Sequence, residues 1–127
     1  MSVPSVSVII SVFEQLQYTK RCLAQLEETL AGKLDYEVIL IDDASKDGTV
    51  EFLKGLGEHH RVFFNDQNQG FAKNNNFGAR EAQGEYLCFL NNDVFVQGNW
   101  LRPMLRVFDE KEKVGMVGNV QKLAGSK

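Results

Sequence analysis

The sequence is poor in cysteine and contains no long apolar run, and each shortage excludes a class of protein. Its two cysteines, Cys22 and Cys88, are far apart and belong to no paired motif, which argues against a disulfide-stapled fold. We expect both thiols to be buried and structural, with a disulfide or a metal site as the alternative. The longest apolar runs, such as YLCFL at residues 86–90, are far too short for a membrane-spanning helix.

The charge of the chain is also modest, which limits the partners that it can bind. The formal net charge is −3 and no stretch is strongly basic, so nucleic acid is not expected as the main partner. Residues 1–4 lack the basic and apolar regions of a secretion signal. We therefore expect a cytoplasmic protein, with attachment to a membrane surface left open for a longer form of it.

Apolar segments with strand-like and helix-like spacing alternate along the 127 residues. The expected strands are residues 5–12, 36–41, 61–64, 85–90 and 114–117, and the expected helices are residues 19–30, 49–56, 71–83 and 100–110. This alternation is typical of an α/β domain in which a mainly parallel sheet carries helices on both faces. At this length a single domain is expected.

The strand at residues 86–90 raises a question about function. It reads as a segment buried on both faces, yet Asn91, Asn92 and Asp93 follow it directly. Asn and Asp are good turn formers, so a plain turn is one explanation. A ligand site is the other, because ligands of open parallel sheets bind beyond the carboxyl ends of the strands.

Polar side chains follow two further strands of the expected sheet. Ser11, Phe13 and Glu14 lie at the end of the first strand, and Asp42 and Asp43 lie at the end of the second. An acidic pair after a strand is by itself more often a helix-capping turn than a binding site. Because parallel strands end at the same edge, however, all these clusters could face one crevice, and this favours a site.

The chemistry of these side chains suits a nucleotide. A carboxylate accepts hydrogen bonds from a base N–H group or from ribose hydroxyls. A second carboxylate near a diphosphate needs a divalent cation between them, and Mg²⁺ or Mn²⁺ prefers such oxygen ligands. Asp93 is placed for that role, while Asn91 and Asn92 add hydrogen-bonding capacity without further negative charge.

Three motifs resemble the nucleotide-sugar-binding half of the family 2 glycosyltransferases, which are inverting enzymes with the GT-A fold. They are SVIISVFEQLQYTKRCLAQL, VILIDDASKDGT and NQGFAKNNNFGAREAQGEYLCFLNNDV, in the family's order and spacing. The resemblance runs over residues 5–120. It implies a Rossmann-like nucleotide-diphospho-sugar transferase fold in truncated form, with residues 1–127 as one nucleotide-sugar-binding domain of a longer glycosyltransferase.

The resemblance also implies roles for the candidate residues. The nucleotide-binding set would be Ser11, Phe13, Glu14, Asp42, Asp43, Asn68 and Asn92, and the metal ligand would be Asp93. Within that set, Ser11 and Phe13 would line the base pocket, and Asp43 would accept a hydrogen bond from the base. Asp42 would support the same turn, and Asn92 would lie near the ribose. The implied cofactor is Mn²⁺ or Mg²⁺.

The implied reaction is metal-assisted transfer of a sugar, with inversion, from a nucleotide-diphosphate sugar to a hydroxyl of a carbohydrate or lipid-linked acceptor, as in polysaccharide biosynthesis. The family's general base lies in the second half of its catalytic domain, so we expect it beyond Lys127. Two positions depart from the family pattern, because Ser11 stands where Pro is common and Lys73 where Gly is common. A non-catalytic nucleotide-binding or interaction module on the same fold is the alternative.

One other protein class and the position of Trp100 also have to be considered. A dinucleotide-binding oxidoreductase also shows alternating strands and helices, but it needs a glycine-rich turn after the first strand, and residues 12–15 contain no glycine. Trp100 is expected to pack at the start of a helix, and a position bordering the sugar pocket is its alternative.

Overall fold

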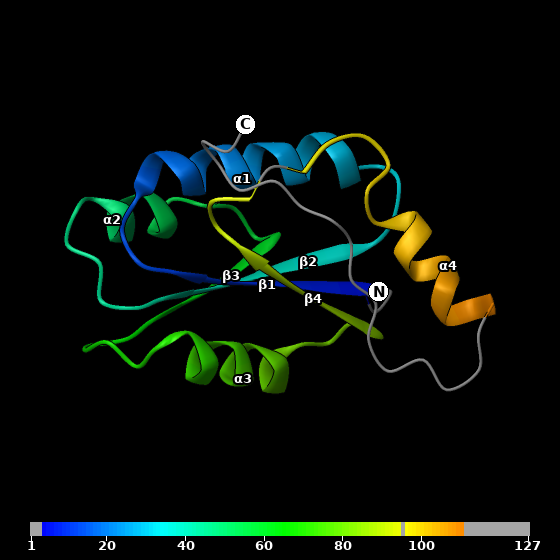
Figure 1. Cartoon of the computed structure of the whole chain (residues 1–127). Coiled ribbons are helices and arrows are strands. Elements are labelled where there is room, and N and C mark those ends of the chain that lie inside the picture. Colours follow the sequence, from blue (N-terminus) through cyan, green and yellow to red (C-terminus); the bar gives the residue numbers. More distant parts are fainter. Residues whose placement is uncertain (1–3, 95, 111–127) are drawn as a thin grey trace.

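The computed structural model describes residues 4–94 and 96–110. The elements in chain order are β1 (Val6–Val12), α1 (Leu16–Leu30), β2 (Tyr36–Asp42), α2 (Thr49–Lys54), β3 (His60–Phe64), α3 (Phe71–Glu81), β4 (Tyr86–Asn91) and α4 (Arg102–Glu110) (Figure 1). The strands form one sheet in the order β3-β2-β1-β4. None of the described helices is long and apolar enough to cross a membrane.

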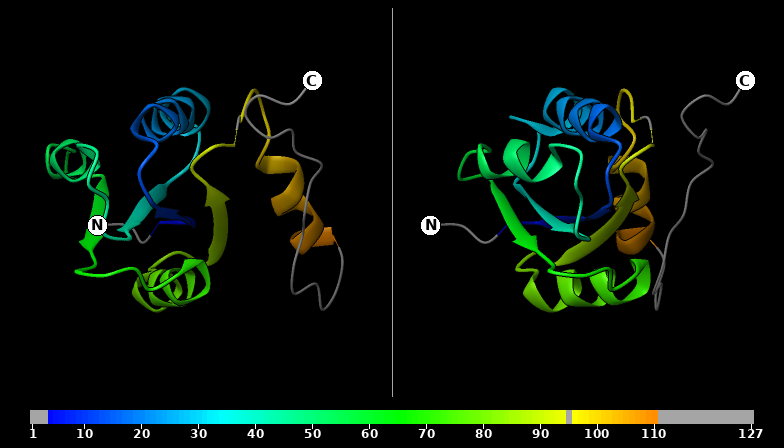
Figure 2. Two further views of the ribbon diagram at one scale, coloured as in Figure 1. Left: turned by 60° about the vertical axis from the view of Figure 1, so that its left-hand side comes forward. Right: turned by 90° about the vertical axis from the view of Figure 1, so that its left-hand side faces the viewer.

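The sheet is parallel at each of its pairings, as the alternation of strands and helices predicts. Helices α1 and α2 lie on one face and α3 on the other, while α4 lies beyond β4, at the opposite end of the sheet from β3 (Figure 2). The prediction of a parallel sheet with helices on both faces is therefore confirmed. The expected strand at residues 114–117 lies outside the described residues.

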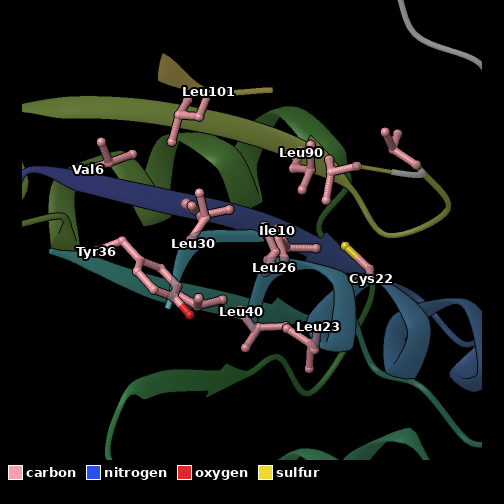
Figure 3. Close-up of a cluster of buried hydrophobic side chains, with 14 of the residues drawn as sticks. Val6, Ile10, Cys22, Leu23, Leu26, Leu30, Tyr36, Leu40, Leu90 and Leu101 are labelled. Carbon is pink, nitrogen blue, oxygen red and sulfur yellow. The ribbon is translucent and has the colours of Figure 1, made fainter. Parts of the chain in front are cut away.

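Most of the core lies between the sheet and α1 (Figure 3). Because side chains alternate along a strand, Val8 and Ile10 of β1 face this helix, whereas Ile9 packs with Ile39 and Ile41 on the α3 face. Cys22 is buried within the larger cluster and Cys88 packs against it, and both are free thiols. The expected structural role of the cysteines is consistent with these positions.

Helix α3 lies close to the sheet because of a glycine. A Cβ atom added at Gly78 would lie 2.5 Å from Cγ2 of Ile9, so any side chain there would push the helix away. The chain leaving α3 is equally close, since a Cβ at Gly84 would lie 2.7 Å from the backbone nitrogen of Ser7. These two glycines fix the distance between α3 and β1.

A buried carboxylate anchors the same connection at the amino edge of the sheet. Glu37 accepts hydrogen bonds from the Ser7 hydroxyl at 2.5 Å and from the backbone N–H of Gln83 at 2.7 Å. Arg61 adds a salt bridge to Glu37 at 3.3 Å. Burial raises the pKa of Glu37, but these hydrogen bonds and the Arg61 charge outweigh it and hold that pKa below its ordinary value.

Some element boundaries and one burial prediction differ from expectation. Helix α1 begins at Leu16 rather than at residue 19, and α4 begins at Arg102 rather than at residue 100. The prediction that β4 is buried on both faces is wrong: Leu87 is 43% and Phe89 47% exposed. The reason is that β4 is the edge strand of the described sheet and α3 packs against β1 and β2.

Candidate functional site at the carboxyl edge of the sheet

The polar clusters do lie at one edge of the sheet. In the parallel register, Val12 is paired with Asp42 and Ser11 with Asn91, so β1, β2 and β4 end at the same level. The segment between β3 and α3 begins at this edge as well, since the backbone N–H of Asn65 donates to the carbonyl oxygen of Asp42 at 2.9 Å. The candidate site is built from these four loops.

Asp43 is the best-connected side chain of the edge. Its Oδ1 accepts hydrogen bonds from the backbone N–H of Gln69 at 2.7 Å and from the side-chain amide of Asn65 at 3.0 Å. Its Oδ2 accepts from the backbone N–H of Gly70, the N-cap residue of α3, at 3.2 Å. The carboxylate therefore satisfies donors at the start of α3 and also places a negative charge there.

The environment of Asp43 keeps it ionised. The residue is only 7% exposed, and this burial raises the pKa of its carboxyl group. The hydrogen bonds from Gln69, Asn65 and Gly70 stabilise the charged form more strongly, and the net result is a pKa below the ordinary value. At neutral pH the group is therefore a hydrogen-bond acceptor only.

A chain of amides links Asp43 to Ser11. The amide nitrogen of Asn65 also donates to Oδ1 of Asn74 at 2.8 Å, and the amide nitrogen of Asn74 donates to the Ser11 hydroxyl oxygen at 3.0 Å. Asn74 is 2% exposed, while Asn65 and Ser11 are half-buried. Asn65 is not among the residues that were predicted from the sequence. Its position directly after β3, at the carboxyl edge, was the available signal.

Asn68 supports the same loop through its side chain. Its amide nitrogen donates to the main-chain oxygen of Asp43 at 2.6 Å. The residue is exposed, so its amide oxygen remains available at the surface.

Asp42 points to the other face of the sheet, away from Asp43. It is fully buried, and its Oδ2 accepts from the backbone N–H of Ser45 at 3.0 Å. Its Oδ1 is buried and has no hydrogen-bond partner within the described part of the chain. The Ser45 hydroxyl oxygen accepts from the backbone N–H of Glu14 at 2.7 Å, and the Glu14 carboxylate accepts from the N–H of Lys46 at 3.3 Å. Glu14 thus joins the loops after β1 and β2, and Asp42 holds Ser45 in place for this contact.

These two loops carry backbone strain. Glu14, Gln15 and Ala44 have positive φ angles of 54°, 56° and 68°. These angles lie in the left-handed region, which is unfavourable for residues other than glycine. The hydrogen bonds between Glu14 and the loop at Ser45 hold this conformation. Strained residues held in this way are frequent at functional sites.

The end of β4 is fixed to α1. The Asn92 amide nitrogen donates to the Thr19 hydroxyl at 3.0 Å. Asp93 is half-buried, and Cys22 has a pKa raised to about 12, first by its own burial and then by the negative charge of Asp93. Among residues 4–94 and 96–110, no hydrogen bond joins Asp93 to Asp42 or Asp43. Asp93 follows β4 at the carboxyl edge of the sheet, where the acidic turn also lies.

The chain then runs along α1 away from the site. The backbone N–H of Val96 donates to Oε1 of Gln25 at 3.0 Å, and the indole N–H of Trp100 donates to the Thr29 hydroxyl at 3.0 Å. Thr29 is near the C-terminal end of α1, which is the end opposite the carboxyl edge. Trp100 thus packs against the core, as first expected, at the end of α1 that lies away from the carboxyl edge.

Aromatic rings are exposed beside the acidic turn. Phe13, directly after β1, is 50% exposed, and Phe71, the first residue of α3, is 56% exposed. Large exposed aromatic rings next to buried polar groups suit a ligand that combines a flat ring with hydrogen-bonding edges. The family resemblance implies a place in the base pocket for Phe13, whereas Phe71 was predicted only as part of a helix.

Few of the described side chains at this edge could coordinate a metal ion. Within the described residues there is no group of three or more His, Cys, Asp or Glu side chains that could hold a metal ion. The half-buried carboxylate of Asp93 fits only a site in which a bound diphosphate and water supply most ligands. Mg²⁺ in phosphate-binding enzymes is often held in this way, by one or two carboxylates together with substrate phosphates.

Comparison with known proteins agrees on one family. Residues 7–125 match the model of glycosyl transferase family 2. An uncharacterized glycosyltransferase of Haemophilus influenzae is 31% identical over 126 residues, which are 94% of this chain and 48% of that protein. Glycosyltransferase AglE of Haloferax volcanii is 30% identical over 79% of this chain and 34% of its own length. The chain thus spans about half or less of the length of these relatives.

Solved structures share the fold. Staphylococcus aureus TarS matches with a TM-score of 0.72 and 25% identity, over 84% of this chain and 20% of TarS. The mannosyltransferase PcManGT of Pyrobaculum calidifontis, solved with GDP-Man and Mn²⁺, matches with a TM-score of 0.68 and 22% identity, over 77% of this chain and 30% of that protein.

Proposed function

Because this chain belongs to glycosyl transferase family 2, we propose that it is the donor-binding part of an enzyme that transfers a sugar from a nucleotide diphosphate to an acceptor hydroxyl. The structure has the parallel α/β arrangement expected of the truncated GT-A fold. The observation that carries the proposal is the ionised, nearly buried carboxylate of Asp43 at the carboxyl edge, beside the exposed ring of Phe13.

The nucleoside would bind where these groups meet. Asp43 would accept a hydrogen bond from an N–H group of the base, and the Ser11 hydroxyl would donate to the base on the β1 side. The exposed ring of Phe13 offers a surface on which a base can stack. Glu14, Asp42 and Asn68 would contribute by holding the loops in place, since each is bonded to loop backbone.

The diphosphate would lie toward the end of β4. Asp93 would hold a divalent cation there, either Mn²⁺ or Mg²⁺, and such an ion supplies positive charge that offsets the charge developing on the leaving diphosphate. Asn92, whose amide is oriented by Thr19, would lie near the ribose. Nucleotide affinity should consequently depend on the ion.

Sugar transfer also requires a general base and a site for the acceptor. The acceptor hydroxyl must lose its proton to a general base as it attacks the anomeric carbon. We propose that this base and the site for a carbohydrate or lipid-linked acceptor lie in the second half of a longer protein that is cytoplasmic and acts in polysaccharide biosynthesis with inversion at the anomeric carbon.

Titration calorimetry with Mn²⁺ and UDP, TDP or GDP tests the proposal. We expect at least one of the three to bind a folded sample in the presence of the ion, and more weakly when the ion is removed by EDTA. Failure of all three to bind would refute donor binding. A non-catalytic nucleotide-binding module is the second candidate, and binding that is unaffected by removal of the ion would favour it.

A further inference from the structure

We propose that a cavity at the amino edge of the sheet is a second binding site, and that it takes a small organic cation with an alkylammonium group. The cavity has a volume of about 620 Å³ and lies between the second half of α1 and the first residues of β2 and β3. This edge is opposite the candidate site described above, so the inference does not rest on the proposed function.

Tyr36 brings a nearly buried hydroxyl group to this cavity. The residue lines the cavity, belongs to the cluster between the sheet and α1, and is 8% exposed (Figure 3). Among residues 4–94 and 96–110, no group forms a hydrogen bond with this hydroxyl. Buried tyrosine hydroxyls usually have such a partner, and a ligand that supplies one would gain affinity.

His60 lines the same cavity and carries a second polar atom without a partner. Its Nδ1 is buried and makes no hydrogen bond within the described part of the chain. Burial lowers the pKa of His60, and the neighbouring His59 lowers it further, so the neutral ring dominates at pH 7. A neutral imidazole has one nitrogen that accepts a hydrogen bond. The cavity can therefore pair with a ligand that donates hydrogen bonds.

The charges around the cavity favour a cation. Its lining has one guanidinium group, that of Arg61, which is already engaged in salt bridges at 3.3 and 3.0 Å. The lining also has four carboxylates, those of Glu27, Asp35, Glu37 and Glu58. Glu37 is paired with the guanidinium group, while the other three are exposed and form no salt bridge among the described residues. An anion would be repelled at this cavity.

Glu27 connects this negative charge with the buried hydroxyl. Burial, and after it the charge of Glu27, raises the pKa of Tyr36, which shows that the carboxylate lies close to that group. The rings of Tyr36 and His59 meet edge to face, with their centroids 4.3 Å apart. A carboxylate beside aromatic rings is a suitable environment for an ammonium group, which is attracted to both.

An organic cation fits this cavity better than a metal ion. The described residues include no group of three or more His, Cys, Asp or Glu side chains that could hold a metal. An ammonium group needs no such set of ligands, because it donates up to three hydrogen bonds to separate acceptors. Leu23, Leu26 and Val38 also line the cavity and would contact a hydrocarbon chain. The cavity therefore matches an ammonium group on an apolar tail.

An NMR titration of the folded chain with n-pentylamine tests the inference, and 1-pentanol and pentanoate serve as probes with the same tail. We expect pentylamine to bind with millimolar affinity, about tenfold or more tightly than pentanol, and pentanoate not to bind. The largest amide shifts should fall on Tyr36, His60 and the second half of α1. Absence of binding, equal binding of amine and alcohol, or shifts confined to the carboxyl edge would overturn the inference.

Two variants test the groups that we assign to the site. Glu27→Gln removes one charge and should weaken pentylamine binding about threefold. Glu28→Gln is the matched control, because this exposed neighbour on α1 does not line the cavity, and it should bind like the wild type. Unchanged affinity in Glu27→Gln, or an equal loss in Glu28→Gln, would contradict the site.

Tyr36→Phe keeps the ring and removes only the hydroxyl group. Because that group has no partner among the described residues, the variant should remain folded with an unchanged urea midpoint. We expect it to bind pentylamine about fivefold more weakly than the wild type. Wild-type affinity in the folded variant would show that the hydroxyl does not contact the ammonium group and would overturn the assignment.

Discussion

The Oδ1 atom of Asp43 lies 2.7 Å from the backbone nitrogen of Gln69, 26 residues further along the chain. This one hydrogen bond ties the end of β2 to the start of α3. The same carboxylate is the proposed acceptor for the nucleotide base. If Asp43 has both roles, its effects on fold stability and on ligand binding have to be measured separately.

Replacing Asp43 by Ala should weaken both stability and binding. The change leaves the N–H groups of Gln69 and Gly70 without their acceptor, and we expect the free energy of unfolding to fall by about 1–3 kcal/mol. Urea denaturation measures that loss, and calorimetry of the folded variant should detect no nucleotide binding. Asp66→Ala is the control, because this exposed carboxylate lies between β3 and α3, in the loop that carries Gln69, and should alter stability by less than about 0.5 kcal/mol. Equal stability of the two variants would contradict the role given to Asp43.

The free energy of unfolding should fall at low pH, and protonation of Asp43 should account for part of this fall. Its native pKa is below its ordinary value of 3.8, so near that pH the unfolded chain binds more protons than the native one. The free energy of unfolding is then highest above pH 3.8 and falls as the pH drops through the lower native pKa. Urea midpoints between pH 6 and pH 2.5 measure the slope.

Glu37 and Asp47 also have lowered pKa values and add to the slope. Asp43→Ala should accordingly show a shallower acid dependence than the wild type, but not a flat one. An unchanged slope in that variant would contradict the conclusion that hydrogen bonds lower the pKa of Asp43 in the native state.

The sequence predicted the sheet well because its evidence is local. Each strand is marked by a short apolar run in the sequence. The polar clusters follow the strands, so a parallel arrangement of the strands is enough to place these clusters at one edge. The partners of Asp43 could not be predicted in the same way, because Gln69 and Gly70 approach it only when the loop before α3 folds back. The exposure of Leu87 and Phe89 escaped prediction for a related reason: an apolar strand has the same composition at the edge of a sheet as in its middle.

Asp93→Ala should remove the dependence of nucleotide binding on Mn²⁺. We expect the affinity for UDP with Mn²⁺ to fall to the level that the wild type shows in EDTA, because a diphosphate then lacks the ion that joins it to the protein. Calorimetry with and without the ion measures both values. Glu85→Ala is a suitable control, since this carboxylate precedes β4 at the amino edge of the sheet. Metal-dependent binding that survives in Asp93→Ala would exclude Asp93 as the ligand.

Gly84→Ala should destabilise the fold through its effect on the spacing of α3 and β1. The new Cβ would lie 2.7 Å from the Ser7 nitrogen and 2.8 Å from the Val6 carbonyl carbon, and backbone atoms cannot move as a side chain can. Overpacking of this kind typically costs about 1–3 kcal/mol. Gly57→Ala is the matched control, because nothing lies within 4 Å of a Cβ at that position. Urea denaturation of both variants would show whether the close approach is real.

Thr29→Val should loosen the segment that runs along α1 from Asn92 to Trp100. The Thr29 hydroxyl accepts from the indole N–H of Trp100 at 3.0 Å, and valine keeps the shape but cannot accept. We expect a loss of about 1 kcal/mol and a melting temperature lower by roughly 4 °C. The chain has a single tryptophan, so its fluorescence reports on this contact directly and should shift in the variant. Thr29→Ser retains the hydroxyl and should leave the emission maximum unchanged, so an equal shift in both variants would mean that packing, and not the hydrogen bond, holds Trp100 in place.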